Sequence, residues 1–226
     1  MSAQAQPYFG AIFDWDGVII DSARLHEESW HRLASELGTR IAPDSFLRGF
    51  GMKSAQIIEQ IHRWSADPEE IARLANRKEA LYREIVAESE IAPLPGVVEW
   101  LHRLKEAEIP SAVASSTQRA NIEAVLARLG LEEVFQAIVS AEDVVHGKPD
   151  PDVFLKAAER LKMPPRKCVV FEDAYVGIQA GHAAGMKVVA VATTHSPDEL
   201  READVVVNRL DELSAEKLGA LVGSSS

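Results

Sequence analysis

The chain has 226 residues, of which 46% are hydrophobic, and a formal net charge of −11. It can therefore bury a sizeable core, but it is poorly suited to nucleic acid, which is bound mainly through lysine and arginine. Its single cysteine permits no intramolecular disulfide, residues 1–7 lack the pattern of a secretory signal, and no apolar run approaches the ~20 residues of a membrane span. We expect a cytoplasmic protein with no nucleic-acid or membrane partner, and a monomer.

The first predicted strand, residues 8–13, runs directly into two aspartates and a glycine. Asp14 and Asp16 are separated by one residue, and Gly17 follows them. A strand that breaks into a loop at a glycine can turn both carboxylates toward one small ligand. Asp14 is ionised at neutral pH and could attack phosphorus without an activating base, while Asp16 could carry a proton. This geometry favours phosphoryl chemistry.

The stretch between the first and second predicted strands is far longer than one crossover helix requires. Helical patterns cover residues 24–37, 54–64 and 71–88, the last preceded by Asp67 and Pro68 as a helix start. We therefore predict an all-helical cap domain over residues 23–92, inserted into a core domain made of residues 1–22 and 93–226. Such a cap would roof a cleft and exclude water.

Short apolar runs alternate with amphipathic segments along the rest of the chain. The further predicted strands are residues 109–114, 137–140, 168–171, 187–192 and 204–207. This alternation indicates an α/β fold, with a Rossmann-like, largely parallel sheet and helices on both faces. Ligands bind such sheets beyond the carboxyl ends of the strands. Asp14, Ser115 and Asp173 each follow such an end.

Two of these strand ends carry further polar residues. Ser115, Ser116 and Thr117 follow the second predicted strand, and Glu172 and Asp173 follow the fourth. The hydroxyls could simply cap the next helix, which is a common role for such residues. They could equally donate hydrogen bonds to a transferring phosphoryl group, which requires donors and cations around it.

Lys148 precedes a predicted helix start, in which Asp150 is the N-cap and Pro151 the first helical residue. A phosphorylated substrate would be repelled by the average charge of this chain. A bound divalent metal, together with Lys148, would have to reverse that charge within the cleft. A solvated surface position is the alternative for this lysine.

Taken in order, these motifs resemble the haloacid dehalogenase superfamily, and most of all its capped phosphatases and β-phosphoglucomutases. The matching motifs are Asp-x-Asp-Gly-Val-x-x-Asp-Ser, the strand-terminal serine, Gly-Lys-Pro-x-Pro, and Glu-Asp before a glycine-rich stretch. The resemblance implies that Asp14 becomes an aspartyl phosphate, and that Asp16 protonates the leaving oxygen and then activates water. It also implies Mg²⁺ bound by Asp14, by the Asp16 carbonyl and by Asp173. Glu172 would either join the metal site or orient it or Lys148.

The same resemblance implies a set of phosphate and substrate contacts. Ser115 and Lys148 would bind the phosphate, with Ser116 beside them. His26 would lie on the helix leading into the cap and Lys78 on the cap, both facing the cleft. Without the resemblance, both would be ordinary solvated residues.

We therefore expect a Mg²⁺-dependent phosphatase acting on a small phosphorylated metabolite, a sugar phosphate above all, with a β-phosphoglucomutase-like mutase as the alternative. Against a mutase, Ser54 stands where the related mutase has an arginine to grip a second phosphate, although Lys53 could partly replace it. Asp16 and the metal-binding acids argue against a dehalogenase. A non-enzymatic sensor would be expected to lack Asp14 or Lys148. Trp15, in place of a smaller aliphatic residue, is interpreted as a packing residue.

Overall fold

The computed structural model describes residues 9–49 and 52–223. Four features of the sequence lie outside these residues, namely segment 1–7, the predicted strand start at Tyr8, Gly51 of the predicted cap domain, and the terminal serines 224–226.

A single six-stranded sheet forms the centre of the fold. The strands are β1 (Gly10–Phe13), β2 (Ser111–Ala114), β3 (Ala137–Val139), β4 (Cys168–Glu172), β5 (Lys187–Val191) and β6 (Val205–Val207). Their order is β3-β2-β1-β4-β5-β6, and every pairing is parallel. The predicted α/β class with a largely parallel sheet is confirmed, and each predicted strand is present within two residues at either end. The central strands are continuous apolar runs because both of their faces are buried.

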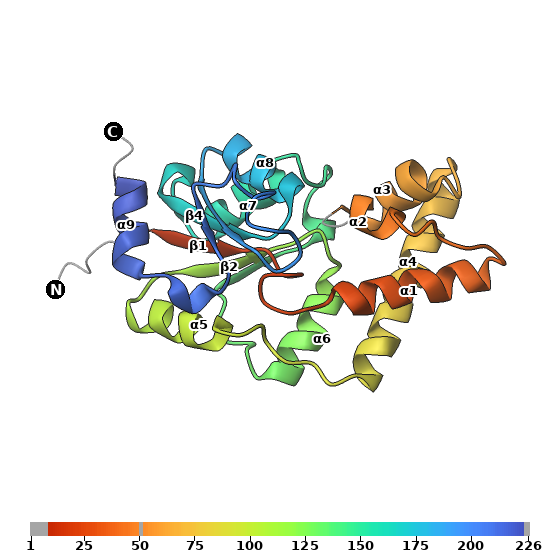
Figure 1. The fold of residues 1–226 in the computed structure, drawn as a ribbon, viewed down its shortest axis with the longest axis horizontal. Helices are drawn as coiled ribbons and strands as arrows, with labels where there is room; N and C mark the ends of the chain where they lie inside the picture. Colours follow the sequence, from red (N-terminus) through yellow and green to blue (C-terminus); the bar gives the residue numbers. More distant parts are fainter. Residues whose placement is uncertain (1–8, 50–51, 224–226) are drawn as a thin grey trace.

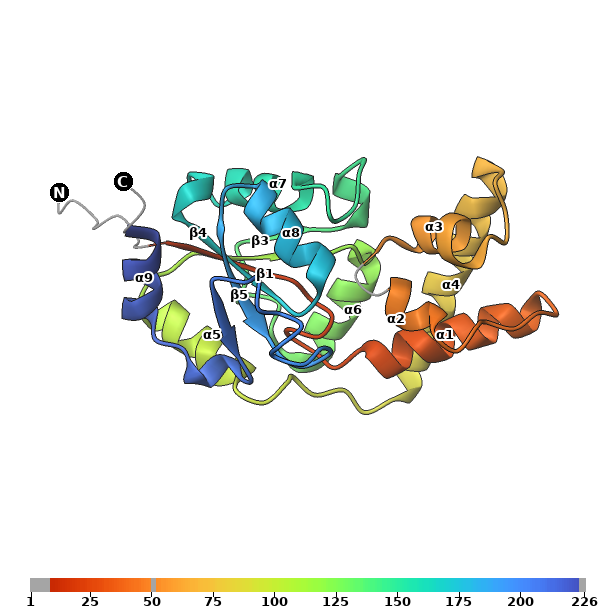
Figure 2. The ribbon, with the colours of Figure 1, turned by 45° about the horizontal axis from the view of Figure 1, so that its top comes forward.

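Helices cover both faces of the sheet (Figures 1 and 2). The helices on one face are α5 (Val97–Glu106), α6 (Arg119–Leu129) and α9 (Ala215–Gly223), and those on the other are α7 (Asp152–Arg160) and α8 (Tyr175–Ala183). Short 3₁₀ segments span Ala141–Asp143, Pro165–Lys167 and Leu210–Glu212. Gly181 lets α8 approach the sheet, since a Cβ there would lie 2.7 Å from Val188.

The helical segment between β1 and α5 lies at one end of the molecule, away from the sheet (Figure 1). It contains α1 (Ala23–Glu36), α2 (Ser45–Gly49), α3 (Ser54–Gln56), a π-helix (Ile57–His62) and α4 (Pro68–Glu88). We call it the helical insertion. It has an apolar cluster of its own, which includes Trp30, Leu33, Ile58, Leu74 and Leu81. The domain limits of 23–92 stay a prediction.

The predicted helix over residues 54–64 differs from a regular α-helix. After Gln56 it widens into a π-helix, and the N–H of Arg63 donates to the carbonyl of Ile58, five residues earlier. Residues five apart would be rotated by about 140° in an α-helix, but they lie on nearly the same side of a π-helix. Ile57 and His62 therefore face the same way. The apolar periodicity could not reveal this change of helix type.

The start of α7 also differs from the prediction. The helix begins at Asp152, and Pro151 occupies the N-cap position that had been expected for Asp150. The N–H of Asp150 donates to the carbonyl of Gly147 at 3.1 Å, so Asp150 belongs to the preceding turn. Its carboxylate still accepts from the N–H of Asp152 at 3.0 Å. Lys148 lies within this turn, and its Nζ contacts the acids that follow β1 and end β4.

Candidate active site

The carboxyl ends of neighbouring strands bring the predicted acids together. Asp14 follows β1 and Asp173 follows β4, while Glu172 is the last residue of β4. Because β1 pairs directly with β4, one carboxylate oxygen from each of the three residues lies within 4.8 Å of the others. All three side chains are buried. Together with Lys148 we call these residues the acid cluster.

Lys148 is completely buried between two of these carboxylates. Its Nζ lies 2.9 Å from Oδ1 of Asp14 and 2.5 Å from Oε1 of Glu172. Burial alone would lower the pKa of Lys148, but the carboxylates of Asp14 and Glu172 raise it above its usual value. Burial raises the pKa of Asp14 to about 8, with Lys148 opposing and Glu172 and Asp16 adding to the rise. The expectation from the sequence that Asp14 is ionised at neutral pH is therefore wrong for the protein without a bound cation. The surface alternative for Lys148 is therefore wrong.

The two acids of β4 differ in how they are bonded. Oε2 of Glu172 accepts the N–H groups of Asp173 and Ala174, each at 2.8 Å, while its other oxygen contacts Lys148. Asp173 accepts from Thr194 through Oδ2, but its buried Oδ1 has no hydrogen-bond partner among the described residues. Burial and the neighbouring carboxylates raise the pKa of Asp173 well above its usual value. Because both oxygens of Glu172 are already bonded, this residue can orient Lys148. Asp173 keeps one oxygen available to a ligand.

The acid cluster has the composition that a divalent cation requires. Three carboxylates surround one ammonium, and hard oxygen ligands are those that Mg²⁺ prefers. Gly17 keeps the space open, since it has a φ of 76° and a Cβ there would overlap the Asp173 carboxylate. Asp14 and Asp173 are thus the side chains best placed to hold a cation.

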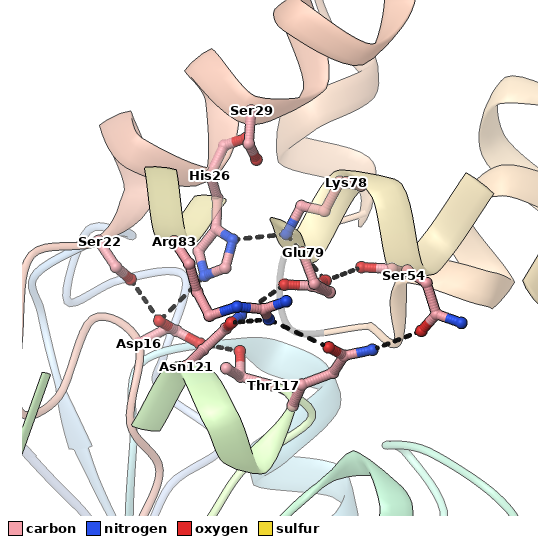
Figure 3. A network of polar contacts seen from close by, with 12 residues as sticks. Asp16, Ser22, His26, Ser29, Ser54, Lys78, Glu79, Arg83, Thr117 and Asn121 are labelled. Carbon is pink, nitrogen blue, oxygen red and sulfur yellow. Dashed lines mark hydrogen bonds and ion pairs between the residues drawn. The ribbon is translucent and has the colours of Figure 1, made fainter. Parts of the chain in front are cut away.

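Asp16 is bonded on the side of the helical insertion and to Thr117 of the sheet domain (Figure 3). Its Oδ1 accepts from Ser22 at 2.5 Å and contacts Nε2 of His26 at 3.1 Å, and its Oδ2 accepts from Thr117 at 2.6 Å. Burial alone would raise the pKa of Asp16, but His26 and the two hydroxyls hold it below its usual range. The roles of Ser22 and Thr117 were not predicted, although both lie within predicted motifs.

His26 and Lys78 lie at the cleft, as the resemblance implied, and neither is solvated. The exposed fractions are 8% for His26 and 2% for Lys78. Nζ of Lys78 lies 2.7 Å from Nδ1 of His26, whose ring stacks on Tyr82 with 4.1 Å between centroids. Since an ammonium can only donate, Nδ1 accepts and the Nε2–H is directed at Asp16.

Glu79 extends this chain of contacts to the sheet domain (Figure 3). Its carboxylate contacts Lys78 at 3.1 Å and accepts from Ser54 and Asn121, each at 2.5 Å. Burial would raise the pKa of Glu79, but Lys78 lowers it below the usual value, so the group is a carboxylate. Asn121 belongs to α6, so the contact joins the insertion to the sheet domain. We call Asp16, His26, Lys78 and Glu79 the insertion network; Glu79 was not predicted.

One cleft is lined both by Asp14 of the acid cluster and by the four residues of the insertion network, while Lys148, Glu172 and Asp173 lie behind its lining. Its floor is formed by Asp14, Asp16, Ser115, Ser116 and Thr117. Its polar wall is formed by His26, Ser54, Lys78 and Glu79, and its outer part by apolar and aromatic side chains of the insertion. Oγ of Ser115 accepts from the N–H of Thr117 at 3.1 Å, so this hydroxyl satisfies a loop N–H and lines the cleft at the same time. Trp15 is fully buried in the core, which confirms the packing interpretation.

The fold and the site together define a class of protein. Its members have a parallel α/β sheet with buried acids at the carboxyl ends of its strands, and a helical insertion next to those acids. A family model described as haloacid dehalogenase-like hydrolase matches residues 11–191. The chain therefore belongs to this family, and the predicted enzyme class and fold are confirmed.

Individual relatives include both phosphatases and a mutase. The chain is 40% identical over 209 residues to the chloroplastic 5-amino-6-(5-phospho-D-ribitylamino)uracil phosphatase of Arabidopsis thaliana, covering 92% of this chain but only 56% of that protein. It is 38% identical to the fructose-1-phosphate phosphatase YqaB of Escherichia coli, over 81% of this chain and 96% of that one. A β-phosphoglucomutase structure from Clostridium difficile matches with a TM-score of 0.84 and 30% identity, covering 95% of this chain and 96% of that one.

Among the described residues, no helix is both long enough and apolar enough to cross a membrane.

Proposed function

We propose that this chain is a Mg²⁺-dependent phosphatase that hydrolyses small phosphorylated metabolites through an aspartyl phosphate on Asp14. The observation that carries the proposal is the environment of Asp14. It is a buried carboxylate at a strand end, 2.9 Å from Lys148 and close to Asp173, whose Oδ1 lacks a partner among the described residues. When bound between Asp14 and Asp173, Mg²⁺ would offset the negative charge of the phosphoryl oxygens.

The proposed reaction has two displacements at phosphorus. In the first, an oxygen of Asp14 forms a bond to phosphorus while the ester P–O bond breaks, and Asp16 gives a proton to the leaving oxygen. In the second, Asp16 takes a proton from water as the oxygen of that water bonds to phosphorus and the P–O bond to Asp14 breaks, which releases phosphate and restores Asp14. The phosphoryl oxygens would lie against the floor of the cleft, which is lined by Ser115 and Ser116. Lys148 contacts Asp14 of this floor.

The chain's own residues can also prepare Asp16 for this task. The Nε2–H of His26 and the hydroxyls of Ser22 and Thr117 fix the orientation of its carboxylate. An incoming phosphate dianion would raise the pKa of Asp16 by repulsion, and so favour the protonated form that the first step requires.

A mutase remains the second candidate because a β-phosphoglucomutase shares the fold closely. The cleft wall favours a phosphatase. The Ser54 hydroxyl donates to the Glu79 carboxylate, so this position offers a phosphate neither a free donor nor the bidentate group of an arginine. Nζ of Lys53 donates to the carbonyls of Ala141 and Val144, and is thereby held away from the role of gripping a phosphate.

A phosphate-release screen tests the proposal. Purified protein would be offered sugar phosphates and polyol phosphates with Mg²⁺ or with an excess of chelator. We expect release that depends on Mg²⁺ and disappears in the Asp14→Asn variant. Hydrolysis that persists in chelator, or conversion to an isomer that requires a bisphosphate and frees little phosphate, would contradict it. The cytoplasmic location and the monomeric state stay predictions.

A further inference from the structure

The outer half of the cleft is unlike its floor. It is lined by Trp30, Ile41, Phe46, Met52, Ile57 and His62, all from the helical insertion. A sugar phosphate alone would offer hydroxyls to this surface, and apolar walls gain little from hydroxyl groups. The lining therefore points to a different kind of chemical group at the end of the substrate remote from the phosphate.

We propose that the outer half of the cleft binds a flat, largely apolar ring joined to the phosphate through a hydroxylated chain. This deepens the proposed function by naming a substrate class, and it rests on that function for the phosphate end. Aromatic walls favour planar rings because stacked and edge contacts add to the gain from apolar burial. Ser54 and Glu79 line the same cleft and would exchange hydrogen bonds with the hydroxylated chain.

His62 supplies the polar contact that a heterocycle would need. It is half-buried, and burial lowers its pKa, so it is a neutral imidazole at neutral pH. Its ring lies 4.3 Å from that of Trp64 and 5.1 Å from that of Trp30, but its nitrogens make no hydrogen bond to the described residues. A neutral imidazole can donate through one nitrogen and accept through the other, which suits a ring amide.

The π-helix places this histidine in the cleft. Ile57 and His62 begin and end the π-helix, and both line the cleft. A regular α-helix would turn one of them away by about 140°. Such widened turns occur frequently at functional sites. The local departure from α-helical geometry therefore builds this part of the cleft.

Matched pairs of phosphates test the proposal without requiring turnover. Ribose 5-phosphate would be compared with uridine 5′-monophosphate, and ribitol 5-phosphate with flavin mononucleotide, by calorimetric titration of the Asp14→Asn variant with Mg²⁺. In each pair the phosphate and chain are alike and only one member carries the ring. We expect the ring to lower Kd at least about tenfold in one pair or both. Equal or weaker binding of the ring-bearing member in both pairs would overturn the proposal.

Variants of the outer cleft locate the effect. In the Asp14→Asn background, Phe46→Ala should raise Kd at least about fivefold for the preferred ring-bearing ligand, while changing that of its ring-free partner less than about twofold. Leu47→Ala is the matched control, since Leu47 follows Phe46 on α2 but is 62% exposed. Should Phe46→Ala fail to fold, Met52→Ala provides the same test. Equal weakening of both members of the pair would contradict the proposal.

Turnover then separates this proposal from the proposed function. With the unmodified protein, hydrolysis that favours ring-free phosphates would overturn the ring-binding proposal and leave the phosphatase standing. Tight binding of ring-bearing phosphates without release of phosphate would support the ring site and overturn the phosphatase.

Discussion

The two aspartates of the first motif stand only two positions apart, yet they lie in opposite electrostatic environments. In the acid cluster, Asp14 shares a single ammonium with other carboxylates, and burial raises its pKa to about 8. In the insertion network, Asp16 accepts from Ser22 and Thr117 and contacts His26, and its pKa falls below the usual range. The first site has one ammonium for three carboxylates, whereas the carboxylate of Asp16 in the second already accepts several hydrogen bonds.

This difference teaches how one short motif can supply two chemical roles. A carboxylate with excess negative charge around it gains from a cation, and a cation in turn keeps it ionised as a nucleophile. A carboxylate fixed by several donors is held in one orientation, as a group that transfers protons must be. The predictions below alter one environment while leaving the other intact.

Replacing the nucleophile should have the largest effect on activity. We expect Asp14→Asn to lower kcat by about 10³-fold or more, because the amide cannot form the aspartyl phosphate. The fold should be retained, since the change removes a charge from a buried cluster of like charges. Phosphate release and circular dichroism would measure the two effects. Retained turnover would remove Asp14 from the mechanism.

Removing the ammonium of the acid cluster should damage both stability and activity. Lys148→Met leaves Asp14 and Glu172 buried without their cation, and we expect unfolding to become easier by about 3–5 kcal/mol. Lys167→Met, at an exposed lysine, is the control and should change little. Denaturant titration would measure both variants. An unchanged midpoint for Lys148→Met would show that the cluster is not held by this ion pair.

The stability of the metal-free protein should fall as pH rises from about 4 to 8. The unfolded Asp14 loses its proton near 3.8, whereas the folded one keeps it up to about 8, so the folded state binds more protons within this window. Added Mg²⁺ should raise Tm more at pH 8 than at pH 5, because the metal competes with fewer protons there. Thermal melts with chelator or Mg²⁺ would measure both trends. A metal-free protein that gains stability across this window, or a Tm that does not respond to Mg²⁺, would contradict the account of the acid cluster.

A change in the insertion network should have the smallest effect of the four. We expect Glu79→Gln to lower kcat/KM about tenfold and stability by about 1 kcal/mol, because it removes the charge that pairs with Lys78. The pH profile of kcat/KM should shift as well, which a purely structural role would not produce. Glu84→Gln, at a half-exposed residue of the same helix, is the matched control. Loss of Mg²⁺ binding in Glu79→Gln would show that the two environments are not independent.

The sequence predicted the sheet well because its central strands are buried on both faces and therefore appear as continuous apolar runs. The acids and Lys148 were predicted because each stands at the end of a strand or before a helix. The contact of Glu79 with Asn121 could not be predicted, since the two are 42 positions apart and neither lies in a recognisable motif. The contact of Asp16 with Thr117 spans 101 positions, and single-chain patterns do not reveal which strand-end hydroxyl turns toward which acid.

The π-helix escaped prediction for a different reason. Apolar residues over 54–64 fit an α-helical period, and a local widening shifts that period by only one residue. The consequence is functional, since this widening turns His62 into the cleft beside Ile57. The overall scaffold thus follows from periodicity and strand ends, whereas the outer cleft depends on local helix geometry.

The most direct test of the central claim is diffraction from crystals grown with Mg²⁺. We predict a cation bound by carboxylate oxygens of Asp14 and Asp173, at about 2.1 Å from each, with Asp16 still bonded to His26 and Thr117. An acid cluster that stays free of cation at saturating Mg²⁺ would contradict the account. So would a cation bound by the Asp16 side chain and Glu79, because the account assigns the cation to Asp14 and proton transfer to Asp16.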